Sequence, residues 1–463
     1  MGTSVSDRRR TIIACALLAV LVFTKILLRP MGGLDELWVY GVARGVAMGY
    51  VPYRDFTMAT VPLFYLLFSI PLRVVRNMFM FRITSAALLF AFGFVYYRIA
   101  FRMTDHLWGL TASLLLVSFM DYATYNALMV LLTLIIFILF QKFSVRNAVI
   151  IGVLSALAIL SRQTSGVFLL IAMIVYMCVD KKLRKFILPY IAGLGSVMVL
   201  FAAYLLMTGS FSAFWDCCFF AIIGPGEKNT GIGRDGVMAY ILIAAGLISS
   251  VVLIKKNKER MDINHMVFGL VLLTIGIPIF DMMHVYYAAA WFLIPVIKLM
   301  KKSVSETVLK IVIALMIVFV LFINAYELPG RTLDNRYREF ELIPVRTAEL
   351  DYYEQINAVN SKYRAEGKRV VTLSCGSCII SMMNETYDPG YDMFLIGNTG
   401  TRSAVSVIEE EMENPDVIFV IADDYEDENW QNPRGVLSVI QDNCTPIERY
   451  DAFVWYESSS AGA

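Results

Sequence analysis

LDELWVYGVARGVAMGYVPYRDFTMATVPLFYLLFSIP, residues 34–71, directly follows the first strongly hydrophobic segment of the chain. The stretch opens with two adjacent carboxylates, Asp35 and Glu36, and carries a third at Asp55. An amphipathic helical pattern separates these acids, and an aromatic passage punctuated by prolines follows it. Carboxylates at the edge of a bilayer are costly to desolvate. We therefore expect the chain to use these acids.

The composition is that of a polytopic membrane protein. Hydrophobic residues make up 58% of the chain and charged residues 17%, and the mean hydropathy is +0.63. These values exclude an ordinary soluble globule. The net charge of +1 gives no bulk attraction for a polyanion, so we expect no nucleic-acid partner. The basic Arg8–Arg10 cluster and the apolar run after it could form a signal peptide, but the run is long and has no small-residue cleavage site, which favours a retained anchor.

Apolar segments of the length needed to cross a bilayer recur along the first 325 residues. We predict about eleven transmembrane helices, at residues 11–29, 82–101, 107–120, 124–140, 148–161, 165–179, 186–207, 237–254, 264–280, 284–300 and 306–325. Two of these segments, 107–120 and 148–161, are short, which leaves the number uncertain by one or two. Residues 61–72 are apolar but bounded by prolines, which is typical of an interfacial or half-inserted helix.

Basic clusters occur at every second connection between these segments. Because Lys and Arg in short loops stay in the cytoplasm, the N-terminus should be cytoplasmic and the C-terminus extracytoplasmic. The outer connections then hold the carboxylates of the opening stretch and most of the remaining acids and bases between the segments. Convergence of these groups in space does not follow from topology.

The composition changes near residue 327. We expect a transmembrane domain at 1–326, with a first outer loop at 30–81, and an extracytoplasmic α/β domain at 327–463. Strand-like runs at 369–374, 416–421 and 452–456 alternate with helical patterns at 345–366, 402–413 and 435–442. This alternation predicts a parallel sheet flanked by helices.

The order of motifs in the first outer loop resembles the GT-C superfamily of integral-membrane glycosyltransferases, in the branch of protein mannosyltransferases and lipid A aminoarabinose transferases. Asp35 and Glu36 match the family's acidic pair, Asp55 matches its later acid, and the run Pro62-Leu63-Phe64-Tyr65 matches P-L-x-Y. The chain departs from the family at Ala59-Thr60-Val61, where Lys-Pro is usual. If that lysine holds phosphate in the family, another base must serve here. Outside this loop the resemblance extends only to the layout.

The resemblance implies a hexosyl or pentosyl transferase of the bacterial plasma membrane. Its donor would be a sugar on a polyprenyl-phosphate carrier, and its acceptor a hydroxyl of a glycan, lipid or protein of the cell envelope, such as a cell wall polysaccharide. Transfer would invert the anomeric carbon, with Asp35 as general base. Glu36 and Asp55 could orient the acceptor or hold a divalent metal ion, since metal dependence varies across the superfamily. The structural alternative is that these acids are solvated groups at the start of a surface helix.

Further outer-face residues are candidates for substrate binding. Arginine forks bind phosphate well, but Arg162 could equally be an interfacial arginine that snorkels to headgroups, and basic residues in a glycine-rich loop are ordinary. The histidine and acid at the start of a late segment match the family layout and could also be structural. The candidates are Tyr53, Asp121, Arg162, Gln163, Lys228, Arg234, Asp281 and His284.

Two alternatives remain for other parts of the chain. Cys375 and Cys378 form a C-x-x-C pair after a predicted strand, and a local disulfide or two thiols is favoured over redox catalysis because no thioredoxin-like pattern surrounds them. The rival function is a membrane transporter or lipid flippase with an extracytoplasmic sensor domain. Transporters carry ionisable groups within broken helices, whereas the expected spans of this chain have almost none. The C-terminal domain would cover or bind the acceptor.

Overall fold

A computed structural model describes residues 5–31, 33–221, 231–232, 236–277, 279–301, 303–333, 336–373, 377–387, 398–422 and 435–458. The chain divides into two compact units, each assembled from separate stretches. Unit 1 comprises Met1–Arg29, Arg82–Phe201 and Thr230–Pro329. Unit 2 comprises Pro30–Phe81, Ala202–Asn229 and Gly330–Ala463. The first outer loop therefore belongs to the same unit as the C-terminal residues.

A helix lies at each of the eleven positions where the sequence predicts a span. These helices are α1 (Val5–Leu28), α4 (Met78–Met103), α5 (His106–Ser118), α6 (Tyr125–Phe140), α7 (Val145–Ser161), α8 (Gln163–Val179), α9 (Ile187–Met207), α12 (Val237–Asn257), α13 (Arg260–Leu273), α14 (Met282–Met300) and α15 (Glu306–Glu327). Within the described residues, α1, α4, α9, α12, α14 and α15 are long and apolar enough to cross a membrane. The other five have 13–17 residues, so the number of spans stays a prediction.

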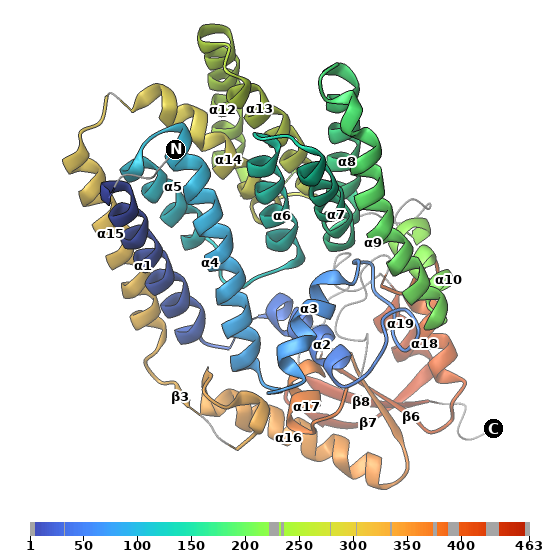
Figure 1. The fold of residues 1–463 in the computed structure, drawn as a ribbon. Coiled ribbons are helices and arrows are strands. Elements are labelled where there is room, and N and C mark those ends of the chain that lie inside the picture. Colours follow the sequence, from blue (N-terminus) through green and yellow to red (C-terminus); the bar gives the residue numbers. More distant parts are fainter. Residues whose placement is uncertain are drawn as a thin grey trace. The chain divides into compact units, whose positions relative to one another are not determined.

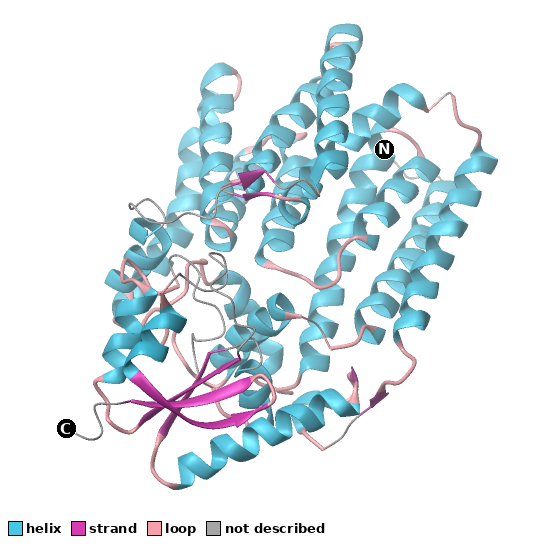
Figure 2. Ribbon diagram, turned by 180° about the vertical axis from the view of Figure 1, so that it is seen from behind, coloured by secondary structure: helices cyan, strands magenta, loops and turns pink. Residues whose placement is uncertain are grey.

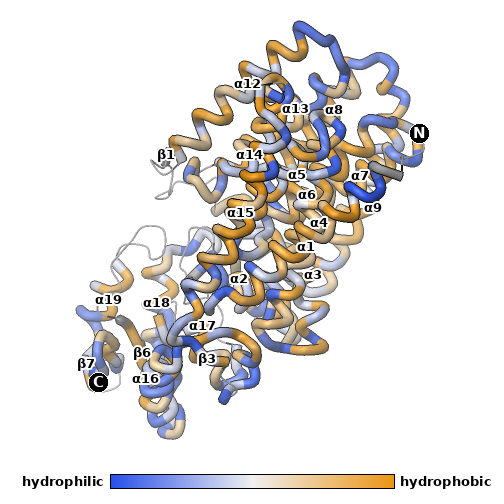
Figure 3. Tube along the Cα trace, turned by 90° about the vertical axis from the view of Figure 1, so that its left-hand side faces the viewer, coloured by the Kyte–Doolittle hydropathy of each residue, from blue (hydrophilic) through white to orange (hydrophobic). Residues whose placement is uncertain are grey.

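Local sequence explains where several helices of unit 1 begin. Side chains cap the first turns of α5, α7, α14 and α15, where Asp105, Ser144, Asp281 and Ser305 each accept a hydrogen bond from a free backbone N–H. The helices are apolar over most of their length, as the orange trace of α15 shows (Figure 3). Short elements complete the unit: η1 (Arg184–Phe186), η4 (Thr274–Gly276), and the parallel pair β1 (Gly231–Ile232) and β2 (Ile279–Phe280).

The first outer loop forms two helices of unit 2, α2 (Leu34–Ala47) and α3 (Leu63–Leu72). Helix α3 covers the segment expected to be interfacial, and its ten residues are too few to span a bilayer. The same unit contains α10 (Phe211–Trp215) and the single π-helical turn η2 (Asp216–Phe220). Figure 1 shows α2 and α3 in blue beside the orange helix α17 (Ser377–Met383).

The C-terminal part of unit 2 contains a four-stranded sheet in the order β5-β6-β8-β7. Its strands are β5 (Arg369–Leu373), β6 (Val417–Ala422), β7 (Cys444–Tyr450) and β8 (Phe453–Ser458). The expectation of a parallel sheet is wrong, because only β5 and β6 pair in parallel and β8 is antiparallel to both of its neighbours. The strand missed from the sequence, β7, turns into β8 through a two-residue hairpin in which Asp451 has φ 51°.

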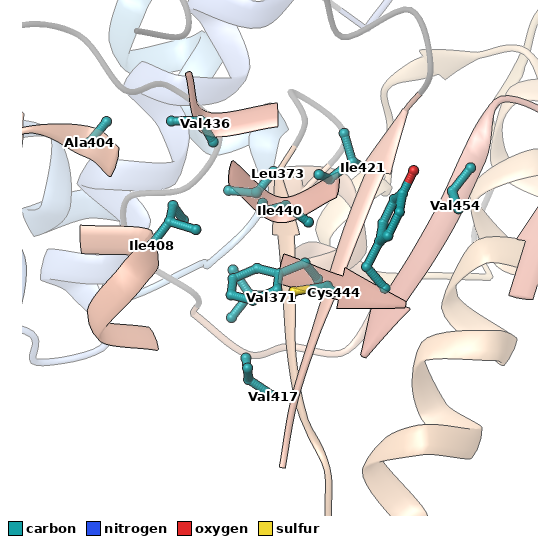
Figure 4. Packing of buried hydrophobic residues seen from close by; sticks show 12 residues of the cluster. Val371, Leu373, Ala404, Ile408, Val417, Ile421, Val436, Ile440, Cys444 and Val454 are labelled. Atoms are coloured by element: carbon teal, nitrogen blue, oxygen red, sulfur yellow. The ribbon is translucent and has the colours of Figure 1, made fainter. Parts of the chain in front are cut away.

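Helices cover both faces of this sheet, as expected from the alternating patterns. On one face α18 (Ala404–Met412) and α19 (Val436–Asn443) pack against alternate strand residues such as Val371 and Phe419 (Figure 4). The opposite residues, including Ile418 and Trp455, face α16 (Thr347–Ala365) and α17. Figure 2 shows the four magenta strands beside the long helix α16. The period of two along each strand thus builds two apolar cores.

A short connection joins the last helix of unit 1 to this layer. It contains the antiparallel pair β3 (Thr332–Leu333) and β4 (Pro344–Val345), with the 3-10 turn η5 (Arg338–Phe340) between them. The turn brings Glu339 and Phe340 into the interior of unit 2, where both are buried. Because it carries a buried carboxylate, this connection is more than a linker.

Candidate active site

Helix α2 presents one carboxylate to solvent. Of residues 35–46, Asp35 alone is exposed, and every other residue is buried. Glu36, its neighbour, is 1% exposed. Both acids lie in the first turn, where free N–H groups and the helix dipole favour negative charge. The helix therefore holds the Asp35 carboxylate at an accessible end of an otherwise enclosed element.

The third acid of the loop, Asp55, is engaged by its own neighbours. Its carboxylate accepts hydrogen bonds from Arg54 Nε at 2.7 Å, from Arg54 Nη2 at 2.8 Å and from the Val51 N–H at 2.7 Å. The bonds from Arg54 lower the pKa of Asp55, against a smaller opposing effect of burial. Asp55 is thus an ionised, weakly basic group that closes the turn at 51–55, which makes it a poorer general base than the sequence suggested.

The residues named for a metal ion do not form a ready ligand set. Both Asp55 oxygens already accept hydrogen bonds, so metal binding would require the Arg54 contact to break. Among the described residues, no group of three or more His, Cys, Asp or Glu side chains is placed to hold a metal ion. A hard divalent cation needs six or more oxygen ligands, from protein and water together. We derive no chemical step from a metal held by Glu36 and Asp55.

Tyr53 has a structural position in the loop. The residue is 3% exposed and adopts φ 66°, a conformation that side chains rarely take. Its hydroxyl donates to the Thr60 carbonyl at 2.6 Å and accepts from Cys218 Sγ at 3.4 Å. Its ring packs edge-on against Phe214. These contacts fix the aromatic passage of the loop to α10 and η2, and a role of Tyr53 in substrate binding stays a prediction.

Asn398 occupies the backbone where the resemblance would place Lys-Pro. Its side-chain oxygen accepts a hydrogen bond from the Ala59 N–H at 2.7 Å, and its carbonyl accepts one from the Thr57 hydroxyl. Nearby, Asp216 accepts from the Thr401 N–H at 2.9 Å and from the Thr401 hydroxyl at 2.8 Å. The segment at 398–401 therefore holds both the first loop and η2 within unit 2.

Arg162 lies in unit 1 and is buried, at 8% exposure. One terminal nitrogen donates to Asn126, and the other donates to the carbonyls of Ile275 at 2.6 Å and Ile277 at 3.2 Å. This arrangement stabilises the irregular backbone after α13 and differs from the snorkelling expected of an interfacial arginine. The phosphate role stays a prediction that would require one of these bonds to be replaced. Gln163 is the partly buried first residue of α8.

Asp281 and His284 of unit 1 contact each other. Asp281 Oδ1 accepts from the His284 N–H at 3.0 Å and lies 2.7 Å from His284 Nδ1, so the acid both caps α14 and orients the imidazole. Burial raises the pKa of Asp281, but the hydrogen bonds from His284 outweigh it and the pKa is lowered. The pair is geometrically suited to present a ring nitrogen, and its contact with substrate stays a prediction.

The remaining candidates divide into one that is described and two that are not. Asp121 lies 3.1 Å from Lys25 Nζ and 3.3 Å from Arg29 Nη1, two bases that the sequence analysis did not select. It is therefore already neutralised within unit 1. Lys228 and Arg234 lie outside the described residues, as does Cys375. Cys378 is described, and its thiol donates to the Leu37 carbonyl at 3.2 Å.

Sequence analysis missed a buried polar cluster in unit 2. Arg44 of α2 and Glu339 of η5 are each 1% exposed and form an ion pair, and the Tyr40 hydroxyl donates to Glu339 Oε2 at 2.8 Å. Burial lowers the pKa of Arg44, but Glu339 outweighs this effect and the pKa is raised. The available signal was an arginine one turn from Tyr40 on the buried face of an apolar helix.

No family model matches this chain, and no curated protein matches it in sequence. Solved structures do match its fold, and they define the class as that of the GT-C integral-membrane glycosyltransferases. ArnT from Cupriavidus metallidurans, bound to undecaprenyl phosphate, is similar with a TM-score of 0.60 at 11% identity, over 98% of this chain and 99% of that chain. The Archaeoglobus fulgidus oligosaccharyltransferase is similar with a TM-score of 0.57 at 11% identity, over 91% of this chain and 70% of that chain. The expected fold is confirmed.

Proposed function

We propose that this protein transfers a sugar from a polyprenyl-phosphate carrier to a hydroxyl acceptor of the cell envelope. The shared fold supports this proposal, because ArnT with the same fold is bound to undecaprenyl phosphate and an archaeal oligosaccharyltransferase is in complex with dolichol-phosphate. The match to ArnT covers nearly the whole of both chains. Fold alone does not determine function, so the residues of α2 must carry the rest of the argument.

The observation that carries the proposal is the exposed Asp35 carboxylate on an otherwise buried helix. A general base must reach the acceptor hydroxyl from an element that does not move during proton transfer. Asp35 meets both requirements, whereas Glu36 is buried and Asp55 is bound to Arg54. We therefore assign Asp35 as the base and leave Glu36 to orient the helix end.

The reaction follows from these assignments. The acceptor oxygen attacks the anomeric carbon, the bond between that carbon and the carrier phosphate breaks, and Asp35 takes the hydroxyl proton. The carrier leaves as polyprenyl phosphate with inversion of the anomeric carbon. A positive group should neutralise the leaving phosphate, and His284, Arg162, Lys228 and Arg234 remain the proposed candidates. We place the reaction at the outer face of a bacterial plasma membrane, with the C-terminal domain outside.

The test compares carrier-linked sugars in wild-type cells, a deletion strain and deletion strains that carry Asp35→Asn or Asp442→Asn. Asp442 is exposed in α19 and serves as the matched control. We expect one polyprenyl-phosphate sugar to accumulate, and that sugar to disappear from the envelope, in the deletion and Asp35→Asn strains only. Loss of a general base lowers the rate about 10²–10⁴-fold. The exposed substitution should leave thermal stability unchanged.

Each result has a distinct meaning. Accumulation in the deletion strain with normal transfer by Asp35→Asn would leave the transferase and remove Asp35 as its base. An unchanged lipid pool in the deletion strain, under conditions where the wild-type protein is made, would overturn the transferase and favour a transporter or flippase. The accumulated lipid also identifies the sugar.

A further inference from the structure

Two stripes of buried residues run along α2. One stripe, at positions 36, 40 and 44, contains Glu36, Tyr40 and Arg44, and the next, at 37, 41 and 45, contains Leu37 and two glycines. Residues four apart lie on one side of a helix, so each stripe is a continuous face. Asp35 lies nine residues before Arg44, which places the two side chains on opposite sides. The exposed acid is thus carried by a helix whose other faces are packed within unit 2.

The first face is attached to C-terminal residues by directed hydrogen bonds. The Arg44 guanidinium donates through Nε to Glu339, through Nη1 to the Thr386 carbonyl and through Nη2 to the Ser381 carbonyl at 3.1 Å. Arg76 Nε approaches the second Glu339 oxygen at 3.4 Å. One guanidinium therefore contacts three acceptors from two separate segments. A planar fork with fixed donor directions sets the rotation of α2 as well as its position.

The second face allows close packing because it lacks side chains. A Cβ atom at Gly41 would lie 3.1 Å from Cys378 Sγ, and a Cβ atom at Gly45 would lie 2.6 Å from two carbons of the Tyr387 ring. The Cys378 thiol also donates to the Leu37 carbonyl. The G-x-x-x-G spacing thus brings α17 and the residues after it against the backbone of α2. The helix is held on two faces by residues from 339 to 387.

We propose that Arg44 and Glu339 are positioning residues of the transferase: their buried ion pair fixes the rotation of α2 and so sets where the Asp35 carboxylate is held. The inference rests on the proposed function and deepens it. It also gives the C-terminal layer a second role, since that layer would complete the catalytic helix as well as cover or bind the acceptor.

The charges themselves support positioning over simple stability. A buried ion pair loses much of its attraction to desolvation, and well-packed apolar residues often stabilise a fold equally well. An apolar contact at this site would hold α2 but would leave its rotation less defined. The pair here is instead surrounded by further directed contacts from Tyr40 and Arg76.

The experiment measures the transfer rate per folded molecule in membranes of the deletion strain, which contain the accumulated donor, together with binding of undecaprenyl phosphate and thermal unfolding. The variants are Arg44→Met, Glu339→Gln and the milder Tyr40→Phe. Glu410→Gln, which removes an exposed ion pair with Arg402 in the same unit, is the control. We expect Arg44→Met and Glu339→Gln to lower the rate about 10–100-fold, since a small misplacement of a catalytic group has that effect. Tyr40→Phe should lower it about 2–5-fold.

A cross-link provides the readout that a merely structural role would not move. Gly41→Cys, made together with Arg44→Met in a Cys375→Ser background, places a thiol beside Cys378. The 3.1 Å separation at this position is close to the about 3 Å between Cβ and the far sulfur of a disulfide. Oxidation should restore the rate at least fivefold, and reduction should remove that gain, with undecaprenyl phosphate binding unchanged throughout.

Two results would overturn the inference while the proposed function stands. The first is an active wild type with Arg44→Met and Tyr40→Phe both within twofold of Glu410→Gln per folded molecule. The second is a rate that falls only in proportion to the amount of folded protein and is not restored by the cross-link. If wild-type membranes transfer no sugar, it is the proposed function that fails, and the positioning role fails with it.

Discussion

Gly45→Ala tests the packing of α2 with a single added methyl group. In the folded chain this methyl would lie 2.6 Å from two carbons of the Tyr387 ring, whereas ordinary carbon contacts are about 3.5–4.0 Å. The ring must therefore retreat by about 1 Å. It is already packed against Tyr50 at a centroid distance of 4.9 Å and against Phe56 at 5.6 Å. Retreat would disturb both of these aromatic contacts.

The magnitude follows from two opposing contributions. Overpacking of this kind costs about 1–3 kcal/mol, and each aromatic contact contributes about 0.5–1.5 kcal/mol. Alanine is favoured over glycine in a helix by about 1 kcal/mol. We expect a net destabilisation of about 1–2 kcal/mol. For a unit of about 200 residues this lowers the midpoint of thermal unfolding by about 2–8 °C.

The assay is thermal unfolding in detergent, followed with a thiol-reactive fluorophore at a fixed heating rate because membrane proteins often unfold irreversibly. The buried Cys217, Cys218 and Cys378 become reactive as unit 2 opens. The matched control is Gly195→Ala in α9, where an added methyl meets no atom within 4 Å. It should raise the midpoint or leave it unchanged. An equal or higher midpoint for Gly45→Ala would refute the proposed close approach of Tyr387.

Two further predictions concern unit 2. Arg54 lowers the pKa of Asp55 in the folded protein, so the stabilisation it provides is present above the unfolded pKa of about 3.9 and is lost as the pH falls through the folded value. Wild type should therefore unfold at a higher temperature than Asp55→Asn at pH 7, and the difference should vanish below about pH 4; a difference that is constant with pH would contradict the ion pair. Trp455 is fully buried and donates to Asn360 at 2.8 Å, so Trp455→Phe should cost about 1–3 kcal/mol for the unsatisfied oxygen alone. Thermal unfolding beside the milder Tyr456→Phe tests this, and equal midpoints for the two variants would show that the hydrogen bond contributes nothing.

Much of the fold was predictable because it depends on local patterns. Long apolar runs form helices wherever backbone groups must be satisfied internally, and this places all eleven expected segments correctly. The alternation in the C-terminal region likewise predicts its helices and three of its strands. The fourth strand, β7, was missed because CTPIERY contains a proline and exposed polar residues at an edge of the sheet. Without that hairpin, the mixed pairing could not be foreseen.

The candidate site was less predictable because its outcome depends on distant partners. Asp35 is exposed as its role requires, but nothing local distinguishes it from the buried Glu36 beside it. Arg162 reads from sequence as an accessible base, and only the backbone of Ile275 and Ile277 shows where its donors go. The partner of Arg44 is 295 residues away. Periodicity identifies a buried face but not the residue that covers it.

The ion pair between Arg44 and Glu339 has a consequence for biosynthesis. The 295 residues between them take about 15–60 s to translate at 5–20 residues per second. During that interval α2 has left the ribosome with an arginine whose carboxylate partner does not yet exist. Its enclosed faces must wait, at the surface of the membrane or with a chaperone, until the last third of the chain arrives. A chain that stops before residue 339 would never bury that arginine with its partner, so quality control has a chemical feature by which to recognise it.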